Sequence, residues 1–189
     1  MNISTPVRNK IKKDALLNDR EVIKKSQMVA LRLGGYLDKL KAIIKSNLSN
    51  PKDDKYQSKL HGIAWVATYV ESLKQMSHWA DRLLKNGSFG KTERIILILS
   101  FNEYINQIFG GIIMSQGEII RPVDLDYKKL ALDKLNCEEV LYFKDEVDAN
   151  HLRSELIDLI IQNEGTSFIG DDGLNEDQRM IRHEFHRFS

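Results

Sequence analysis

The segment Gly87–Thr92 (GSFGKT) has the residue types that could bind a phosphate group. In a P-loop, a glycine followed by lysine and threonine closes a loop whose backbone N–H groups bind nucleotide phosphates. The complete pattern requires a glycine five positions before Gly90, where the chain has Lys85, and it requires a preceding strand. A helical pattern precedes this segment instead. We therefore interpret it as a turn between two helices.

Two histidines near the C-terminus, His183 and His186, flank Glu184 and suggest a metal site. The zinc motif of metalloprotease helices places its histidines four residues apart, whereas these are three apart. Arg182 and Arg187 lie beside them, as is typical of a charged surface. We interpret both histidines as surface residues.

The single cysteine, Cys137, precedes Glu138 and Glu139. Two neighbouring carboxylates should raise the thiol pKa, and a raised pKa makes a poor nucleophile. Cys137 is therefore interpreted as a packing residue. A single cysteine also excludes an internal disulfide framework and favours a reducing compartment, so we expect a cytoplasmic protein.

The remaining candidates are His61, His78, Trp65, Tyr69 and Trp79, which share one helical segment. The histidines are interpreted as interfacial or hydrogen-bonded residues, and the aromatic residues recur at the spacing of a core-facing stripe. No catalytic, cofactor-binding or metal-binding residue is therefore predicted.

The composition favours helices: the 189 residues include three prolines and eleven glycines, with 42% hydrophobic and 29% charged residues. We predict an all-α fold, a bundle of three long helices plus shorter C-terminal helices. The long helices are expected at Arg20–Asn47, Pro51 or Asp54–Lys85, and Lys91–Gly117, and the short ones at Lys10–Leu17, Asp126–Leu135, Cys137–Phe143 and Ala149–Asn163. Gly34 and Gly35 predict a kink or a close helix contact. Gly87 is expected to end the second helix.

The expected organisation is a flexible N-terminus (1–19), a helical bundle extension (20–125), a helical connector (126–173) and the start of a further domain (174–189). Within the bundle, the apolar run Ile95–Met114 is long enough to suggest a membrane span. It contains Asn102, Glu103, Asn106 and Gln107, which are costly in hydrocarbon. We therefore interpret it as the central helix of a soluble bundle.

Charge is distributed unevenly along the chain. Residues 1–59 hold 14 lysines and arginines against 6 aspartates and glutamates, a balance of +8, and the remaining residues have a balance of −7 (14 against 21). A basic arm can bind an anionic partner, but nucleic-acid modules interleave aromatic residues, and here only Tyr36 and Tyr56 do so. A solvated helix surface that faces the acidic remainder or another subunit is the preferred interpretation.

The last fifteen residues, Asn175–Ser189, begin a helix with Asn175 as N-cap and end without a stop signal. Such a helix normally leads into a packed domain, so a continuation is expected. Two earlier stretches are distinctive, namely His61–Leu83 (HGIAWVATYVESLKQMSHWADRL) and Phe89–Leu125 (FGKTERIILILSFNEYINQIFGGIIMSQGEIIRPVDL). They resemble the helical N-terminal extension of a subgroup of bacterial acyl-CoA dehydrogenases. Leu174–Ser189 (LNEDQRMIRHEFHRFS) is similar to the first helix of that family's N-terminal domain.

The resemblance implies an FAD-dependent oxidoreductase of fatty acid metabolism, in which a glutamate base removes the α-proton of an acyl-CoA and flavin N5 accepts the β-hydride. The FAD-contacting β-domain, that glutamate and the C-terminal four-helix bundle match no position in this chain. We therefore expect an N-terminal fragment that binds no FAD alone and acts as a packing or oligomerisation module. Its expected partners are the remaining dehydrogenase body or further copies, without membrane or nucleic acid. The alternative is a free-standing scaffold that binds an anionic partner through Lys24, Lys25, Lys39 and Lys41.

Overall fold

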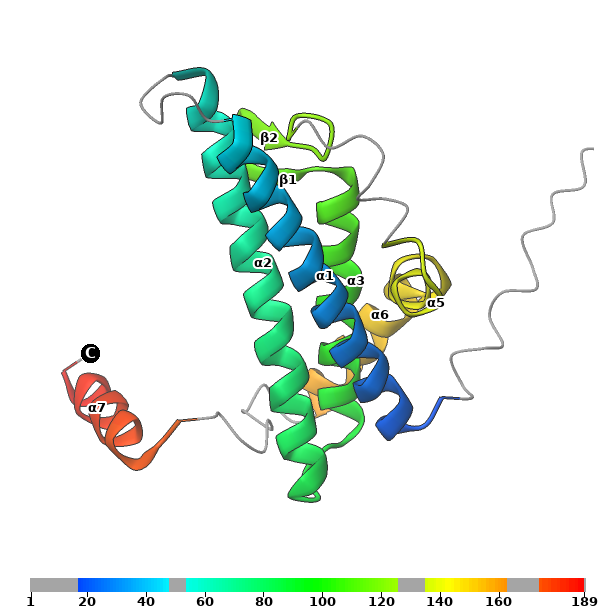
Figure 1. Cartoon of the computed structure of the whole chain (residues 1–189). Coiled ribbons are helices and arrows are strands. Elements are labelled where there is room, and N and C mark those ends of the chain that lie inside the picture. The colour runs from blue at the N-terminus through cyan, green and yellow to red at the C-terminus, as the bar shows by residue number, and fades with distance from the viewer. Residues whose placement is uncertain (1–16, 48–53, 126–134, 163–173, 189) are drawn as a thin grey trace, which may run out of the picture.

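The computed structural model describes residues 17–47, 54–125, 135–162 and 174–188, and these are predominantly helical (Figure 1). The elements in chain order are α1 (Asp19–Asn47), α2 (Asp54–Lys85), α3 (Lys91–Gly110), β1 (Ile112–Ser115), β2 (Glu118–Ile120), α5 (Glu138–Leu141), the π-helical turn η2 (Tyr142–Glu146), α6 (Ala149–Gln162) and α7 (Glu176–Arg187). The predicted all-α fold, with three long helices followed by shorter ones, is confirmed. Most of the predicted helix at Lys10–Leu17 and most of that at Asp126–Leu135 lie outside the described residues.

The three long helices form the core of the molecule. In Figure 1, α1, α2 and α3 run alongside one another, with the chain direction reversing from each helix to the next. Each helix contributes an apolar stripe at three- and four-residue spacing. Fully buried side chains on α1, α2 and α3 include Leu33, Leu40, Leu73, Leu83, Leu97 and Phe101. Burial of each leucine contributes roughly 1.5–3 kcal/mol, so this shared stripe accounts for the bundle.

The turn between α2 and α3 ends the second helix as the sequence predicts. Gly87 has φ +71°, a left-handed conformation that favours glycine. Its N–H donates to Leu84 O at 3.2 Å, and the N–H of Ser88 donates to Leu83 O at 2.8 Å. These two bonds form a Schellman motif, which satisfies carbonyls at the end of α2.

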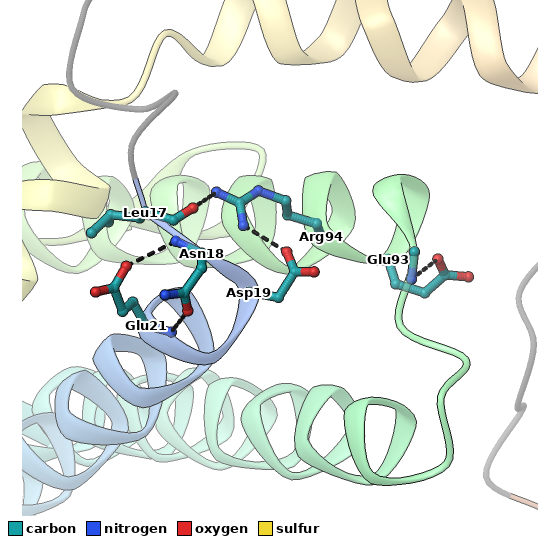
Figure 2. A network of polar contacts seen from close by, with 7 residues as sticks. Leu17, Asn18, Asp19, Glu21, Glu93 and Arg94 are labelled. Carbon is teal, nitrogen blue, oxygen red and sulfur yellow. Dashed lines mark hydrogen bonds and ion pairs between the residues drawn. The ribbon is translucent and has the colours of Figure 1, made fainter.

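The N-terminal ends of α1 and α3 are joined by polar contacts (Figure 2). Asn18 and Glu21 cap α1 reciprocally, with N···O distances of 2.8 and 3.0 Å between backbone and side chain. The guanidinium of Arg94, in the first turn of α3, donates to Asp19 Oδ1 at 2.7 Å and to Leu17 O at 2.9 Å. These contacts fix the two helices in parallel at one end of the bundle.

The prediction that the third helix extends to Gly117 is wrong. The helix α3 ends at Gly110, and residues from Ile112 to Ile120 form an antiparallel hairpin in which Ile112 pairs with Ile120. The cause is Gly111, whose φ of +134° is outside the helical range and favours glycine. Beyond Gly111, burial alternates along β1, which is a strand period.

Glycines also show where the helices approach other elements closely. A Cβ at Gly62 of α2 would lie 2.5 Å from Ile120 Cγ1, so the absence of a side chain there lets the hairpin pack on α2. A Cβ at Gly34 or Gly35 would meet nothing within 4 Å. The predicted close helix contact at this glycine pair is therefore wrong, because the pair faces open space.

The shorter C-terminal helices pack on the bundle through α3. Asn102, which is buried, donates from Nδ2 to Phe143 O at 2.7 Å and so satisfies a carbonyl of the π-helical turn η2. The rings of Phe101 and Phe143 lie 4.9 Å apart. Because α6 also packs against α3, this helix is surrounded by neighbours, as its apolar sequence predicts.

Candidate functional site

The structure assigns ordinary structural roles to the residues of the Gly87–Thr92 segment. Gly90 is the N-cap of α3, and its N–H donates to Glu93 Oε2 at 3.0 Å. The ammonium of Lys91 lies 2.5 Å from Glu155 Oε1 on α6. Because the lysine pairs with α6 and a helix precedes the loop, the interpretation as a helix–helix turn is confirmed.

The histidines of the described residues lie on three helices, with His61 and His78 on α2, His151 on α6, and His183 and His186 on α7. His183 and His186 are exposed on α7, as expected. His61 Nε2 accepts a hydrogen bond from Trp65 Nε1 at 3.0 Å, which confirms its role as a hydrogen-bonded helix residue. Within the described ranges, no three His, Cys, Asp or Glu residues come close enough together to hold a metal ion.

Acidic residues of α5 face the basic helix α1. Lys25 Nζ lies 2.9 Å from Glu138 Oε1, and Arg32 lies 3.6 Å from Glu139 Oε2. Burial raises the pKa of the neighbouring Cys137 thiol, and Glu139 raises it further. The pKa of Cys137 thus shifts in the direction expected from its sequence neighbours, although burial is the larger cause.

An open cleft of about 720 Å³ lies between α2, α3 and α6. Its apolar lining is Met76 and Trp79 of α2 with Leu99 and Tyr104 of α3. The polar lining is Ser72, Gln75, Arg82, Ser100, Glu103 and Arg153. The cleft therefore combines an aromatic and aliphatic wall with two arginines and one glutamate.

A chain of contacts orders the α3 wall of this cleft. Arg153 donates to Glu103 Oε2 at 2.9 Å, and Gln107 Nε2 donates to Glu103 Oε1 at 3.0 Å. Tyr69 donates to Gln107 Oε1 at 2.6 Å and stacks on Tyr104 with ring centroids 4.3 Å apart. Burial raises the pKa of Tyr69, and its neighbours Tyr104 and Glu103 add to that shift, so its hydroxyl remains a donor.

Sequence reasoning did not find this cleft. The sequence predicts Trp79 as a core residue, and in the structure it is half-buried against the hydrophobic core. Arg82 and Arg153 belong to no recognisable sequence motif. The only signal was the i, i+3 spacing of Trp79 and Arg82, which places both on one helix face. Since Arg153 reaches the site through the packing of α6 on α3, spacing along the chain cannot reveal it.

The second feature of the surface is a set of exposed apolar side chains on α6 and α7. On α6, Ile157 and Ile161 are 56% and 68% exposed. In Figure 1, α7 lies clear of the bundle, and none of its residues is buried. Its exposed apolar residues are Met180, Ile181 and Phe185, and the C-cap residue Phe188 is exposed as well. An amphipathic helix that presents its apolar face to solvent is typical of a protein interface.

The start of α7 is as the sequence predicts. The Asn175 side chain accepts from the Gln178 N–H at 2.8 Å, and Gln178 Oε1 accepts from the Asn175 N–H at 2.9 Å. This reciprocal pair is a capping box, so α7 begins with its own local signal although it packs no side chain into the bundle.

Together these features define a helical bundle with exposed helix faces at its C-terminal end, and none of the described helices is long and apolar enough to cross a membrane. No family model matches the chain. The chain is 41% identical, over 129 residues, to the (2S)-methylsuccinyl-CoA dehydrogenase of Cereibacter sphaeroides, a member of the acyl-CoA dehydrogenase family. The match covers 68% of this chain and 23% of that relative. The resemblance expected from the sequence is thereby confirmed, and the chain spans less than a quarter of the relative's length.

Proposed function

We propose that this chain is the helical packing module of an acyl-CoA dehydrogenase-like flavoprotein and supplies none of its catalytic groups. The exposed apolar face of α7 is the observation that carries the proposal. Phe185 of this capped amphipathic helix is 74% exposed, and its C-cap residue Phe188 is 86% exposed. In water such a face is unfavourable, so it is expected to be covered by the dehydrogenase body.

The described residues do not fit an FAD. The cleft between α2, α3 and α6 offers two arginines, one of which pairs with Glu103. A dinucleotide carries two phosphates and normally meets a run of backbone N–H groups at a glycine-rich turn. The GSFGKT turn is instead engaged in capping α3. We therefore assign FAD, and the dehydrogenation of an acyl-CoA, to the dehydrogenase body.

The experiment is co-expression of the tagged chain with the C. sphaeroides relative from which the matched region has been removed. The expected result is co-purification of both polypeptides as a yellow complex that reduces a dye with an acyl-CoA substrate. Phe185→Asp should abolish co-purification, because an aspartate on the apolar face would be buried without a partner. His183→Gln, on the opposite face of α7, is the matched control and should leave co-purification intact.

Two outcomes would contradict the proposal. If Phe185→Asp and His183→Gln co-purify equally well, the apolar face of α7 is not the interface. If the chain alone binds FAD stoichiometrically and reduces the dye with an acyl-CoA, it is a catalyst rather than a packing module.

The alternative of a scaffold that grips an anionic partner has less structural support. Lys25 pairs with Glu138, and Lys41 lies 3.8 Å from Asp38 Oδ1. Two of the four lysines proposed for that role therefore have carboxylate partners within the chain, which lowers the positive potential of α1. A salt-dependent pull-down of RNA, DNA or acidic vesicles that is lost when the four lysines are neutralised would restore this alternative.

A further inference from the structure

We propose that the cleft between α2, α3 and α6 is a binding site for a small aromatic carboxylate. Its volume of about 720 Å³ lies within the size range of small-molecule sites. The walls come from three different helices, so the site exists only in the folded bundle. This site is separate from the α7 face on which the proposed packing function rests.

The charge of the cleft favours a ligand with one negative group. The guanidinium of Arg153 is 2.9 Å from Glu103 Oε2, so these two charges offset each other. Among the described residues, no carboxylate pairs with Arg82. The nearby carboxylate of Asp81 is instead 2.6 Å from Lys85 Nζ. Within the part of the chain that the structure describes, the cleft thus has one positive charge without a paired carboxylate, at Arg82.

The geometry of an arginine suits a carboxylate. The guanidinium presents parallel N–H groups that match the two oxygens of a carboxylate, and such bidentate pairs are stronger than neutral hydrogen bonds. Arg82 is exposed at the edge of the cleft, where a ligand can reach it from solvent. We therefore assign the carboxylate of the ligand to Arg82.

The rest of the lining favours a flat apolar body. Trp79 lies one helical turn before Arg82, and Met76 lies one further turn away, so all three occupy the same face of α2. Across the cleft, α3 contributes Leu99 and Tyr104. Aromatic side chains on both walls favour an aromatic ring over a hydrated polar ligand.

The wall that would receive the ring is already ordered. Tyr104 is stacked on Tyr69 at an interplanar angle of 13°, and Tyr69 is fixed by its hydrogen bond to Gln107. A side chain held by such contacts loses little conformational entropy when a ligand binds. Tyr104 is therefore a pre-organised surface.

The test uses the full chain and 3-phenylpropanoate as the probe, with 3-phenylpropan-1-ol as its uncharged counterpart. The Trp65→Phe variant leaves Trp79 as the single tryptophan of the two in the chain. Its fluorescence should change saturably with 3-phenylpropanoate. Arg82→Gln should weaken binding about tenfold or more, which corresponds to about 1.4 kcal/mol.

The matched control is Arg121→Gln, which removes the same charge at a position outside the cleft and should leave binding unchanged. Arg82→Lys keeps the charge but loses the planar fork, so its affinity should be intermediate. Circular dichroism and the unfolding midpoint verify that each variant is folded. Because Arg82 is exposed, its replacement is not expected to disturb the fold.

Three results would overturn the proposal. They are the absence of saturable binding at millimolar probe, an equal loss of affinity in Arg82→Gln and Arg121→Gln, and equal affinity for the acid and the alcohol. The last result would show that the cleft selects apolar bulk without using Arg82. The outcome is independent of whether α7 binds a dehydrogenase body.

Discussion

Arg94 and Asp19 form an ion pair of 2.7 Å that joins the first turn of α3 to the first turn of α1. The same guanidinium donates to Leu17 O at 2.9 Å, so one arginine holds both the side chain and the backbone at the start of α1. The Arg94 side chain is only 19% exposed, whereas the side chains of the Lys74–Glu71 pair are 52% and 56% exposed. This contact therefore orders two helix ends that are far apart in the sequence.

Arg94→Gln should lower the free energy of unfolding by about 1–2 kcal/mol, because hydrogen bonds to a half-buried charge are stronger than exposed ones. Urea denaturation followed by circular dichroism measures this change. Lys74→Gln is the matched control, since the 3.5 Å pair of Lys74 with Glu71 is half-exposed on both sides. Lys74→Gln should lower the free energy of unfolding by less than about 0.5 kcal/mol. Equal costs for the two variants would show that the Arg94 contact contributes no more than a surface pair.

Two glycine substitutions should change stability in opposite directions. Gly62→Ala places a Cβ 2.5 Å from Ile120 Cγ1, and the resulting overpacking should cost about 1–3 kcal/mol. Gly34→Ala meets nothing within 4 Å and should stabilise α1 by about 0.5–1 kcal/mol through helix propensity. Both are measured by thermal and urea unfolding. Stabilisation by both variants would mean that the hairpin does not pack on α2 as the structure has it.

Asn102→Leu should destabilise the attachment of η2 to α3. The variant leaves Phe143 O without its donor in a buried environment, which costs about 1–3 kcal/mol. Asn106→Ala is the control, because Asn106 Nδ2 donates to a carbonyl of its own helix, Asn102 O, at 2.9 Å. Comparable losses of stability in the two variants would indicate that water replaces the Asn102 amide as the hydrogen-bond donor to Phe143 O.

The thiol of Cys137 should react slowly with iodoacetamide in the folded protein. Burial raises its pKa, so at a given pH less of the thiol is the reactive thiolate. The rate, followed by mass spectrometry against pH, should have its midpoint above that of the same chain unfolded in urea.

Two variants test the direction in which each neighbouring charge shifts the pKa of Cys137. Glu139→Gln should lower the pKa of Cys137, because the carboxylate disfavours the thiolate, and Arg32→Gln should raise it. A midpoint in the wild-type chain below that of the unfolded chain would contradict the burial of this thiol.

Most of the bundle could be predicted from sequence because its helices carry long, regular apolar stripes and local end signals. The start of α7 at Asn175 and the end of α2 at Gly87 are both set by residues within a few positions. The hairpin was missed because Ile112, Ile113 and Met114 continue the apolar run of α3 in sequence, so only the conformation of Gly111 separates the strand from the helix.

The cleft could not be predicted for a different reason. Its lining depends on how α6 crosses α3, which follows from the fit of side chains between the two helices. The ion pair of Arg153 with Glu103 is one result of that packing, and no local spacing rule specifies it.

The hairpin has a consequence for protein engineering. Helix α3 has 20 residues and α2 has 32, so the strand pair covers the part of α2 that α3 does not reach. The strands are held by Ile112 and Ile120, whereas the turn at Gln116 and Gly117 is exposed. A peptide tag or a fluorescent reporter can therefore be spliced into this turn at little cost, because chain closure depends only weakly on loop length. The molecule thus offers an internal labelling position that leaves both the α7 face and the cleft untouched.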